Sequence, residues 1–179
     1  MVEHSARQAS GIAAAAALGW RGVVLAPVEL FGCRCRPVVE LDLEVHRTRR
    51  AHGFLPQLDE DVLAIWEWPE SDGPAPALTL RGALFPVGRS WRRALGEARR
   101  WYGFGPAALL DPTGTACADE DCRWECAFAG VGLVSGLDPG PAVVAAEARP
   151  DSLGRVSADR WVEEFLYEAA LTAGAFPAE

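Results

Sequence analysis

The chain lacks several residue types and motifs, and each absence excludes or disfavours a class of structure or function. It has no lysine and no asparagine, so arginine supplies all 17 basic side chains. Because this bias is typical of a GC-rich gene, arginine use alone does not indicate phosphate recognition. No apolar run reaches the 18 residues of a membrane span, which predicts a soluble protein with no membrane partner. Three histidines leave little material for histidine-based catalysis, and the P-loop, G-x-S-x-G, H-E-x-x-H and G-x-G-x-x-G patterns are absent.

Charge is unevenly distributed along the chain. Residues 1–110 hold 13 Arg and 12 acidic residues, a net charge of +1, whereas residues 111–179 hold 4 Arg and 13 acidic residues, a net charge of −9. The overall charge of −8 makes non-specific binding to nucleic acid or to an anionic membrane unfavourable. Anion binding would therefore require a local basic patch.

Length and hydrophobic content predict a single α+β domain over residues 1–179. Half of the residues are hydrophobic, which is enough for one full core. Periodicity and turn residues predict three helices, at 6–18, 90–102 and 157–174. They also predict about six strands, at 22–30, 37–46, 62–68, 77–85, 124–134 and 142–148. Most strand connections are too short for a helical crossover, so we expect a mainly antiparallel or mixed sheet.

The clearest periodic signal is an alternation of ionisable and aliphatic residues. The ionisable residues occupy every second position, at Glu40, Asp42, Glu44 and His46. On a strand these side chains would share one face, with neighbours about 6.6 to 6.8 Å apart. Asp42 and Glu44 could then share a divalent cation, with His46 as a further ligand. The same alternation is equally typical of an antiparallel strand whose polar face meets water.

Part of this region resembles the opening of small primase–polymerase domains. The segment Gly19–Leu25 follows a predicted helix, and Asp42-Leu43-Glu44 is similar to the acidic strand pair that binds divalent metal in that family. The second acid is Glu rather than Asp, and a matching histidine motif and a third acid are missing. We therefore do not assign the chain to that family.

Five cysteines fall into two groups, Cys33 and Cys35, then Cys117, Cys122 and Cys126. If Cys33, Cys35, Cys117 and Cys122 converged, their thiolates would make a zinc site. Together with the acidic alternation, this makes Zn²⁺ or another divalent cation the candidate cofactor. The spacings match no strong zinc-finger or ferredoxin pattern, and the alternative is that the thiols are small buried hydrophobic groups. The odd cysteine count and the absence of a convincing signal peptide favour the cytoplasm.

The helix predicted at 90–102 has a cationic side. Its arginines repeat with a seven-residue offset, at Arg92, Arg93, Arg99 and Arg100, and Arg89 precedes them. Apolar residues occupy the opposite side, at Trp91, Leu95, Ala98 and Tyr102. Such a helix could bind phosphates or an acidic partner through its arginines. Alternatively, the arginines form a solvated face that pairs with the protein's own acidic C-terminal third.

Trp66 and Trp68 lie on one face of the strand predicted at 62–68. Such a pair could stack on a base, a sugar or a proline-rich peptide, or it could belong to the core or an interface.

Two functional hypotheses follow from these patterns. The first is a non-catalytic binding or accessory protein that contacts a protein or anionic partner through aromatic and arginine-rich surface, because no complete catalytic set is visible. The second is a metal-dependent enzyme acting on a phosphorylated or nucleotide substrate. Its ligands would be Asp42, Glu44 and His46, and the arginine helix would hold the anion.

Overall fold

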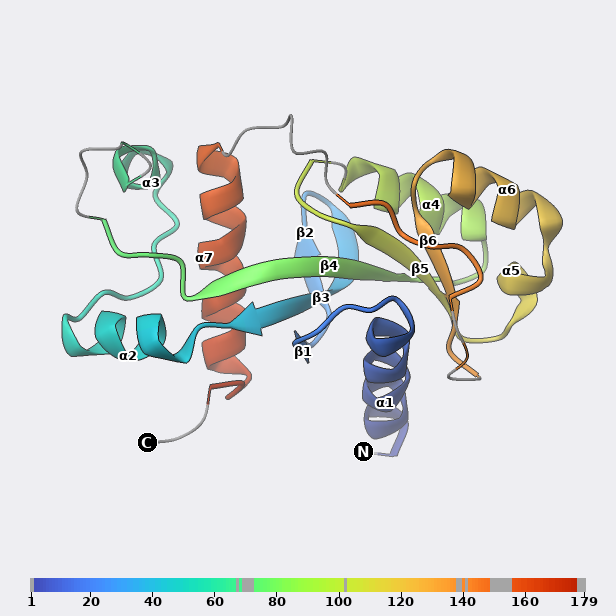
Figure 1. Ribbon diagram of the computed structural model, residues 1–179, viewed down its shortest axis with the longest axis horizontal. Coiled ribbons are helices and arrows are strands. Elements are labelled where there is room, and N and C mark those ends of the chain that lie inside the picture. Colours follow the sequence, from blue (N-terminus) through green and yellow to red (C-terminus); the bar gives the residue numbers. More distant parts are fainter. Residues whose placement is uncertain are drawn as a thin grey trace.

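The computed structural model describes residues 2–66, 68, 73–101, 103–137, 140, 142–148 and 156–176, with side chains from residue 8 onward. Within these ranges the structure is α+β, with six strands in one sheet and seven helices (Figure 1). The helices are α1 Val2–Ala17, α2 Leu43–Ala51, α3 Glu60–Trp66, α4 Trp91–Arg100, α5 Thr115–Ala118, α6 Glu120–Phe128 and α7 Ser157–Thr172. The strands are β1 Val23–Val24, β2 Val28–Leu30, β3 Cys33–Leu41, β4 Leu78–Pro86, β5 Ala107–Asp111 and β6 Gly132–Ser135. The predicted class and strand number are confirmed, whereas three helices was too few.

The sheet is mixed. Its order is β1-β3-β4-β5-β6, and β2 pairs with β3 beside this path. β3 is antiparallel to β1, β2 and β4, whereas β4, β5 and β6 are parallel to one another. Helix α4 joins β4 to β5, and helices α5 and α6 join β5 to β6. The expectation that helical crossovers would be rare is therefore wrong for this half. Strand β5 is buried along its whole length and, like other parallel strands, shows no alternation in sequence.

The strand predicted over 37–46 is wrong beyond Leu41. Asp42 caps helix α2, because its carboxylate accepts hydrogen bonds from the backbone N–H groups of Glu44 at 3.1 Å and Val45 at 2.9 Å. The alternating residues from Asp42 onward therefore lie on a cap and a helix.

Two other predicted strands are also helical. The segment predicted at 62–68 forms most of α3, after Asp59 accepts hydrogen bonds from the first N–H groups of the helix. The segment at 124–134 is the end of α6 followed by β6. Of the segment predicted at 142–148, the structure shows an isolated bridge from Val144 to Leu133.

Helices cover both faces of the sheet (Figure 1). α4, α6 and α7 pack on one face, where Leu95, Cys122 and Leu166 belong to the larger core cluster. α1 packs on the other face with a smaller cluster around Leu84 and Leu110, which the Trp20 ring joins. Over the described residues, no helix has both the length and the apolar character needed to cross a bilayer.

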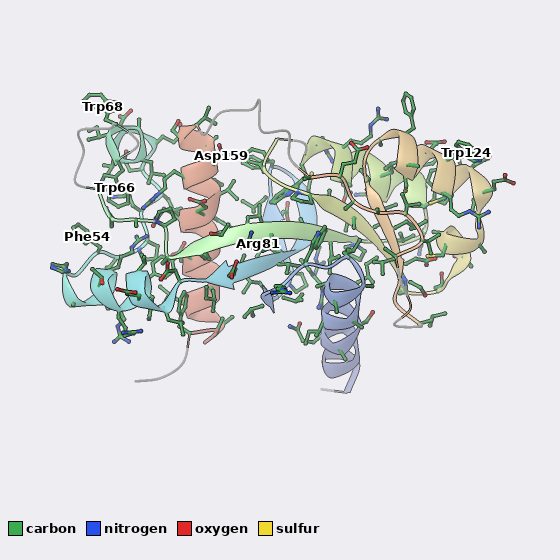
Figure 2. All side chains as sticks on the ribbon, in the orientation of Figure 1. Phe54, Trp66, Trp68, Arg81, Trp124 and Asp159 are labelled. Carbon is green, nitrogen blue, oxygen red and sulfur yellow. The ribbon has the colours of Figure 1, made fainter. Side chains whose placement is uncertain are left out.

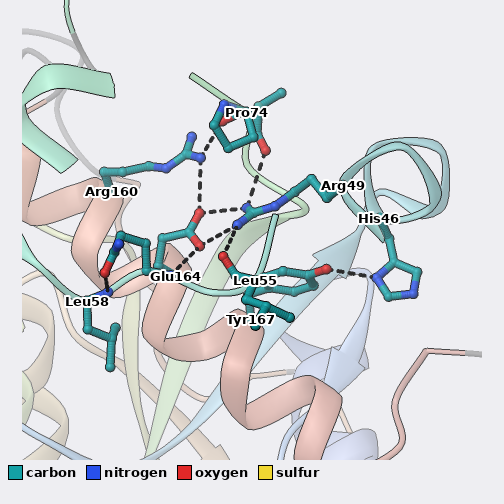
Figure 3. Close-up of polar contacts among 10 residues, drawn as sticks. His46, Arg49, Leu55, Leu58, Pro74, Arg160, Glu164 and Tyr167 are labelled. Atoms are coloured by element: carbon teal, nitrogen blue, oxygen red, sulfur yellow. Dashed lines mark hydrogen bonds and ion pairs between the residues drawn. The ribbon is translucent and has the colours of Figure 1, made fainter. Parts of the chain in front are cut away.

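A buried charge network ties α2 to α7 (Figure 3). The Arg49 guanidinium donates to both Glu164 carboxylate oxygens at 2.7 Å, and both side chains are only 1% exposed. Arg160 adds a second ion pair to Glu164 at 3.0 Å and donates to the Pro74 carbonyl oxygen. The backbone N–H of Gln57 also donates to Glu164 at 3.2 Å. The network therefore fixes α2, α7 and two loops to one another.

Candidate binding surface

Helix α4 presents the predicted arginines to solvent. The exposed basic residues are Arg89, Arg92, Arg93, Arg99 and Arg100. On the opposite side, Ala94, Leu95 and Ala98 are buried. Tyr102, predicted on the apolar side, lies outside the described residues. The seven-residue repeat thus identified the exposed side of this helix correctly.

Acidic side chains pair with part of this arginine stripe. Arg92 lies 3.8 Å from Asp121 and 3.8 Å from Glu125, both on α6. Arg93 pairs with Glu97 one turn along α4 at 3.1 Å. These pairs involve exposed arginines and contribute little stability, so a partner could replace them.

The other three arginines have no such acidic partner in the part of the chain that the structure describes. Arg89, Arg99 and Arg100 make no ion pair with any acidic side chain in the described ranges. Among the described residues, the acidic side chains of the C-terminal third that pair with the stripe are Asp121 and Glu125, and both pair with Arg92.

Two large aromatic side chains are exposed on the neighbouring helix α6. Trp124 is 70% exposed and Phe128 is 89% exposed. They are four residues apart, so they lie on the same side of the helix. Neither residue was predicted as exposed on a helix, because the sequence pattern predicted a strand over residues 124–134. The available signal was the spacing of Cys122 and Cys126, which are buried at helical period on the other side.

A cleft of about 330 Å³ is lined by one arginine of α4 and one aromatic residue of α6. Arg99 from α4 and Phe128 from α6 both line it, together with Glu147. Its inner wall includes Ala107 and Val131, at the amino ends of β5 and β6. We call the combined area the α4–α6 surface. It comprises Arg89, Arg92, Arg93, Arg99, Arg100, Trp124 and Phe128.

The tryptophans selected from the sequence lie elsewhere. Figure 2 places Trp66 and Trp68 at the opposite end of the molecule from Trp124. Trp66 ends α3, where its ring is half-buried and 5.4 Å from the Arg160 guanidinium. Trp68 is exposed beyond that helix. This pair therefore does not share a surface with the arginines of α4.

Asp42 and Glu44 line one pocket, but over the described residues they do not form a metal-binding group with His46. Asp42 and Glu44 are exposed at the start of α2, whereas His46 is buried, and its Nδ1 lies 3.0 Å from the Tyr167 hydroxyl. The His46 ring also stacks on Phe176 with 4.0 Å between ring centroids. The acidic strand pair suggested by the primase–polymerase resemblance is likewise absent, because these residues follow the strand.

The four-cysteine site is not assembled either. Cys33 and Cys35 are buried on β3, and the Cys122 and Cys126 sulfurs lie 4.0 Å apart on α6. Over the described residues, no group of three or more His, Cys, Asp or Glu side chains is placed to hold a metal ion. Burial raises the pKa of Cys35, Cys117 and Cys126 to about 12. Without a metal these thiols are therefore protonated at neutral pH and are poor nucleophiles.

The carboxyl ends of parallel strands often bind ligands, and here Asp111 ends β5. Burial alone would raise its pKa. Hydrogen bonds from the Cys117 N–H and from the N–H and hydroxyl of Thr113 outweigh that effect, so the pKa lies below its usual value. Both carboxylate oxygens accept these local hydrogen bonds. Asp111 therefore stabilises the loop that leads into α5.

No family model matches the chain, and comparisons with curated proteins and with solved structures also gave no match.

Proposed function

We propose that the protein binds an acidic protein segment through the α4–α6 surface. The observation that carries this proposal is that Arg99 and Phe128 line the same cleft. Arginine and aromatic side chains are enriched at protein interfaces and supply much of their binding energy. The cleft gives a partner side chain a place to insert between these two residues.

The charges on the surface define the partner's chemistry. Arg89, Arg99 and Arg100 can each offer a two-pronged hydrogen bond to a carboxylate. On α6, Asp121 and Glu125 would repel carboxylates. The partner's acidic side chains should therefore face α4, and its apolar side chains should cover Trp124 and Phe128.

Labelled peptides of equal length test this chemistry by fluorescence anisotropy. The first peptide combines Glu and Asp with Leu and Trp, the second replaces its acids with Lys, and the third replaces its apolar residues with Ser. We expect only the first peptide to bind, because binding needs both charge and apolar area. Its affinity should fall as salt is raised, because salt screens exposed charges.

Charge reversal then locates the binding site. Arg99→Glu with Arg100→Glu should weaken binding of the first peptide by more than about tenfold, or about 1.4 kcal/mol. Arg21→Glu with Arg47→Glu makes the same change in net charge at exposed positions outside the α4–α6 surface and should leave binding nearly unchanged. Equal loss in both double variants, or no binding of the first peptide, would contradict the proposal.

A further inference from the structure

A second cleft lies at the other end of the molecule, between α2, the loop at residues 53–56 and the end of α7. Its volume is about 510 Å³. Small-molecule sites commonly have volumes of about 300 to 1,000 Å³ and combine apolar walls with a few polar groups. This cleft has both the size and the composition of such a site.

The walls are mainly apolar, and two buried polar side chains contribute to the lining. Phe54, Leu171 and Phe176 supply aromatic and aliphatic area. His46 and Tyr167 line the same cleft and are joined by the 3.0 Å hydrogen bond drawn in Figure 3. Burial raises the pKa of Tyr167, so its hydroxyl keeps its proton at neutral pH. A ligand would therefore meet apolar surface together with the uncharged Tyr167 hydroxyl.

Two arginines lie at or close to the cleft. Arg50 is exposed and lines the cleft directly. Behind Tyr167, the Arg49 guanidinium lies 4.6 Å from the ring centroid. This arrangement favours an anion at the Arg50 side of the cleft.

We infer that this cleft binds a small organic carboxylate with an aromatic or aliphatic body. The carboxylate would pair with Arg50, and the body would cover Phe54, Leu171 and Phe176. The ligand should carry one negative charge, because one arginine, Arg50, is among the described residues that line the cleft. This site is separate from the α4–α6 surface and does not depend on the function proposed for it.

Isothermal titration calorimetry with two matched probes tests this inference. The first probe is 3-phenylpropionate, and the second is its neutral amide, 3-phenylpropanamide, which has nearly the same shape. We expect the carboxylate to bind the full chain at least fivefold more tightly than the amide, because only the carboxylate can form an ion pair with Arg50. Equal affinities, or no binding of the carboxylate, would overturn the inference.

Three variants locate the binding. Arg50→Gln should reduce affinity for 3-phenylpropionate at least fivefold, and Phe54→Ala should also reduce it. Both positions are exposed, so the fold should tolerate these changes. Arg99→Gln removes the same charge from the α4–α6 surface and should leave this affinity unchanged. Binding that Arg50→Gln does not weaken, or that Arg99→Gln weakens equally, would overturn the inference while leaving the peptide experiment unaffected.

Discussion

The two ends of the molecule use the same kind of ion pair in opposite ways. At one end, Arg92 is 61% exposed and lies 3.8 Å from Asp121 and from Glu125. At the other end, Arg49 is 1% exposed and donates to both oxygens of Glu164 at 2.7 Å. Water and salt weaken the first arrangement, whereas the second is dry and geometrically fixed. Arginine content alone therefore does not separate a binding surface from a structural connection.

This contrast also explains why the two proposed sites differ in kind. Exposed arginines can exchange weak partners for an incoming protein at little cost. Buried arginines must keep their partners, because an unpaired buried charge is strongly destabilising. Arg49 thus contributes to the electrostatic potential around the second cleft while its side chain stays in the buried network. Arg50, the next residue in the sequence, is exposed and accessible to a ligand.

The largest expected loss of stability comes from a substitution that breaks the buried charge network. Glu164→Gln leaves Arg49 and Arg160 without their shared carboxylate, so we expect a loss of about 3 to 5 kcal/mol in the free energy of unfolding. Urea denaturation measures this loss. Glu168→Gln, an exposed change on the same helix, should cost less than about 0.5 kcal/mol. A small effect of Glu164→Gln would show that the network is not a structural connection.

An intermediate effect is expected at the start of α2. Asp42→Ala removes two hydrogen bonds to helix N–H groups and should cost about 1 kcal/mol, whereas Asp42→Asn should retain most of the cap. Thermal unfolding with and without Mg²⁺, Mn²⁺ or Zn²⁺ measures both variants. A metal-dependent rise in Tm that Asp42→Ala abolishes would instead support Asp42 as a metal ligand.

The smallest effect concerns the exposed pair. A double-mutant cycle with Arg92→Gln and Glu125→Gln should give a coupling energy below about 0.5 kcal/mol, because both side chains are solvated. High-precision urea denaturation at low and high salt is the measurement. A coupling energy as large as the loss expected for Glu164→Gln would show that the exposed pair stabilises the fold as strongly as the buried one.

Sequence periodicity predicted those parts of the fold in which one face meets water. The seven-residue repeat located the exposed arginines of α4, and the helix predicted at 157–174 corresponds to α7, which buries Val162 and Leu166 on one side. Periodicity failed at Asp42, because a strand end and a helix cap together imitated a longer alternation. It also missed β5, because a strand covered on both faces has no alternation to detect.

The buried charge network could not be predicted from local pattern. Arg49 lies in a basic segment that resembles a solvated helix face, and its partner Glu164 is 115 residues away. The α4–α6 surface was predicted in part. Its arginines were identified, but Trp124 and Phe128 were missed because α6 had been assigned to a strand.

The distance along the chain between Arg49 and Glu164 also has a consequence for folding order. The β4–α4–β5 and β5–α5–α6–β6 units join consecutive strands that pair directly, so their contacts close short loops. The Arg49–Glu164 contact closes a much longer loop, and it requires a segment near the end of the chain. During synthesis, Arg49 must therefore remain hydrated until α7 has been made. We expect the parallel half to form first and the docking of α7 to complete folding.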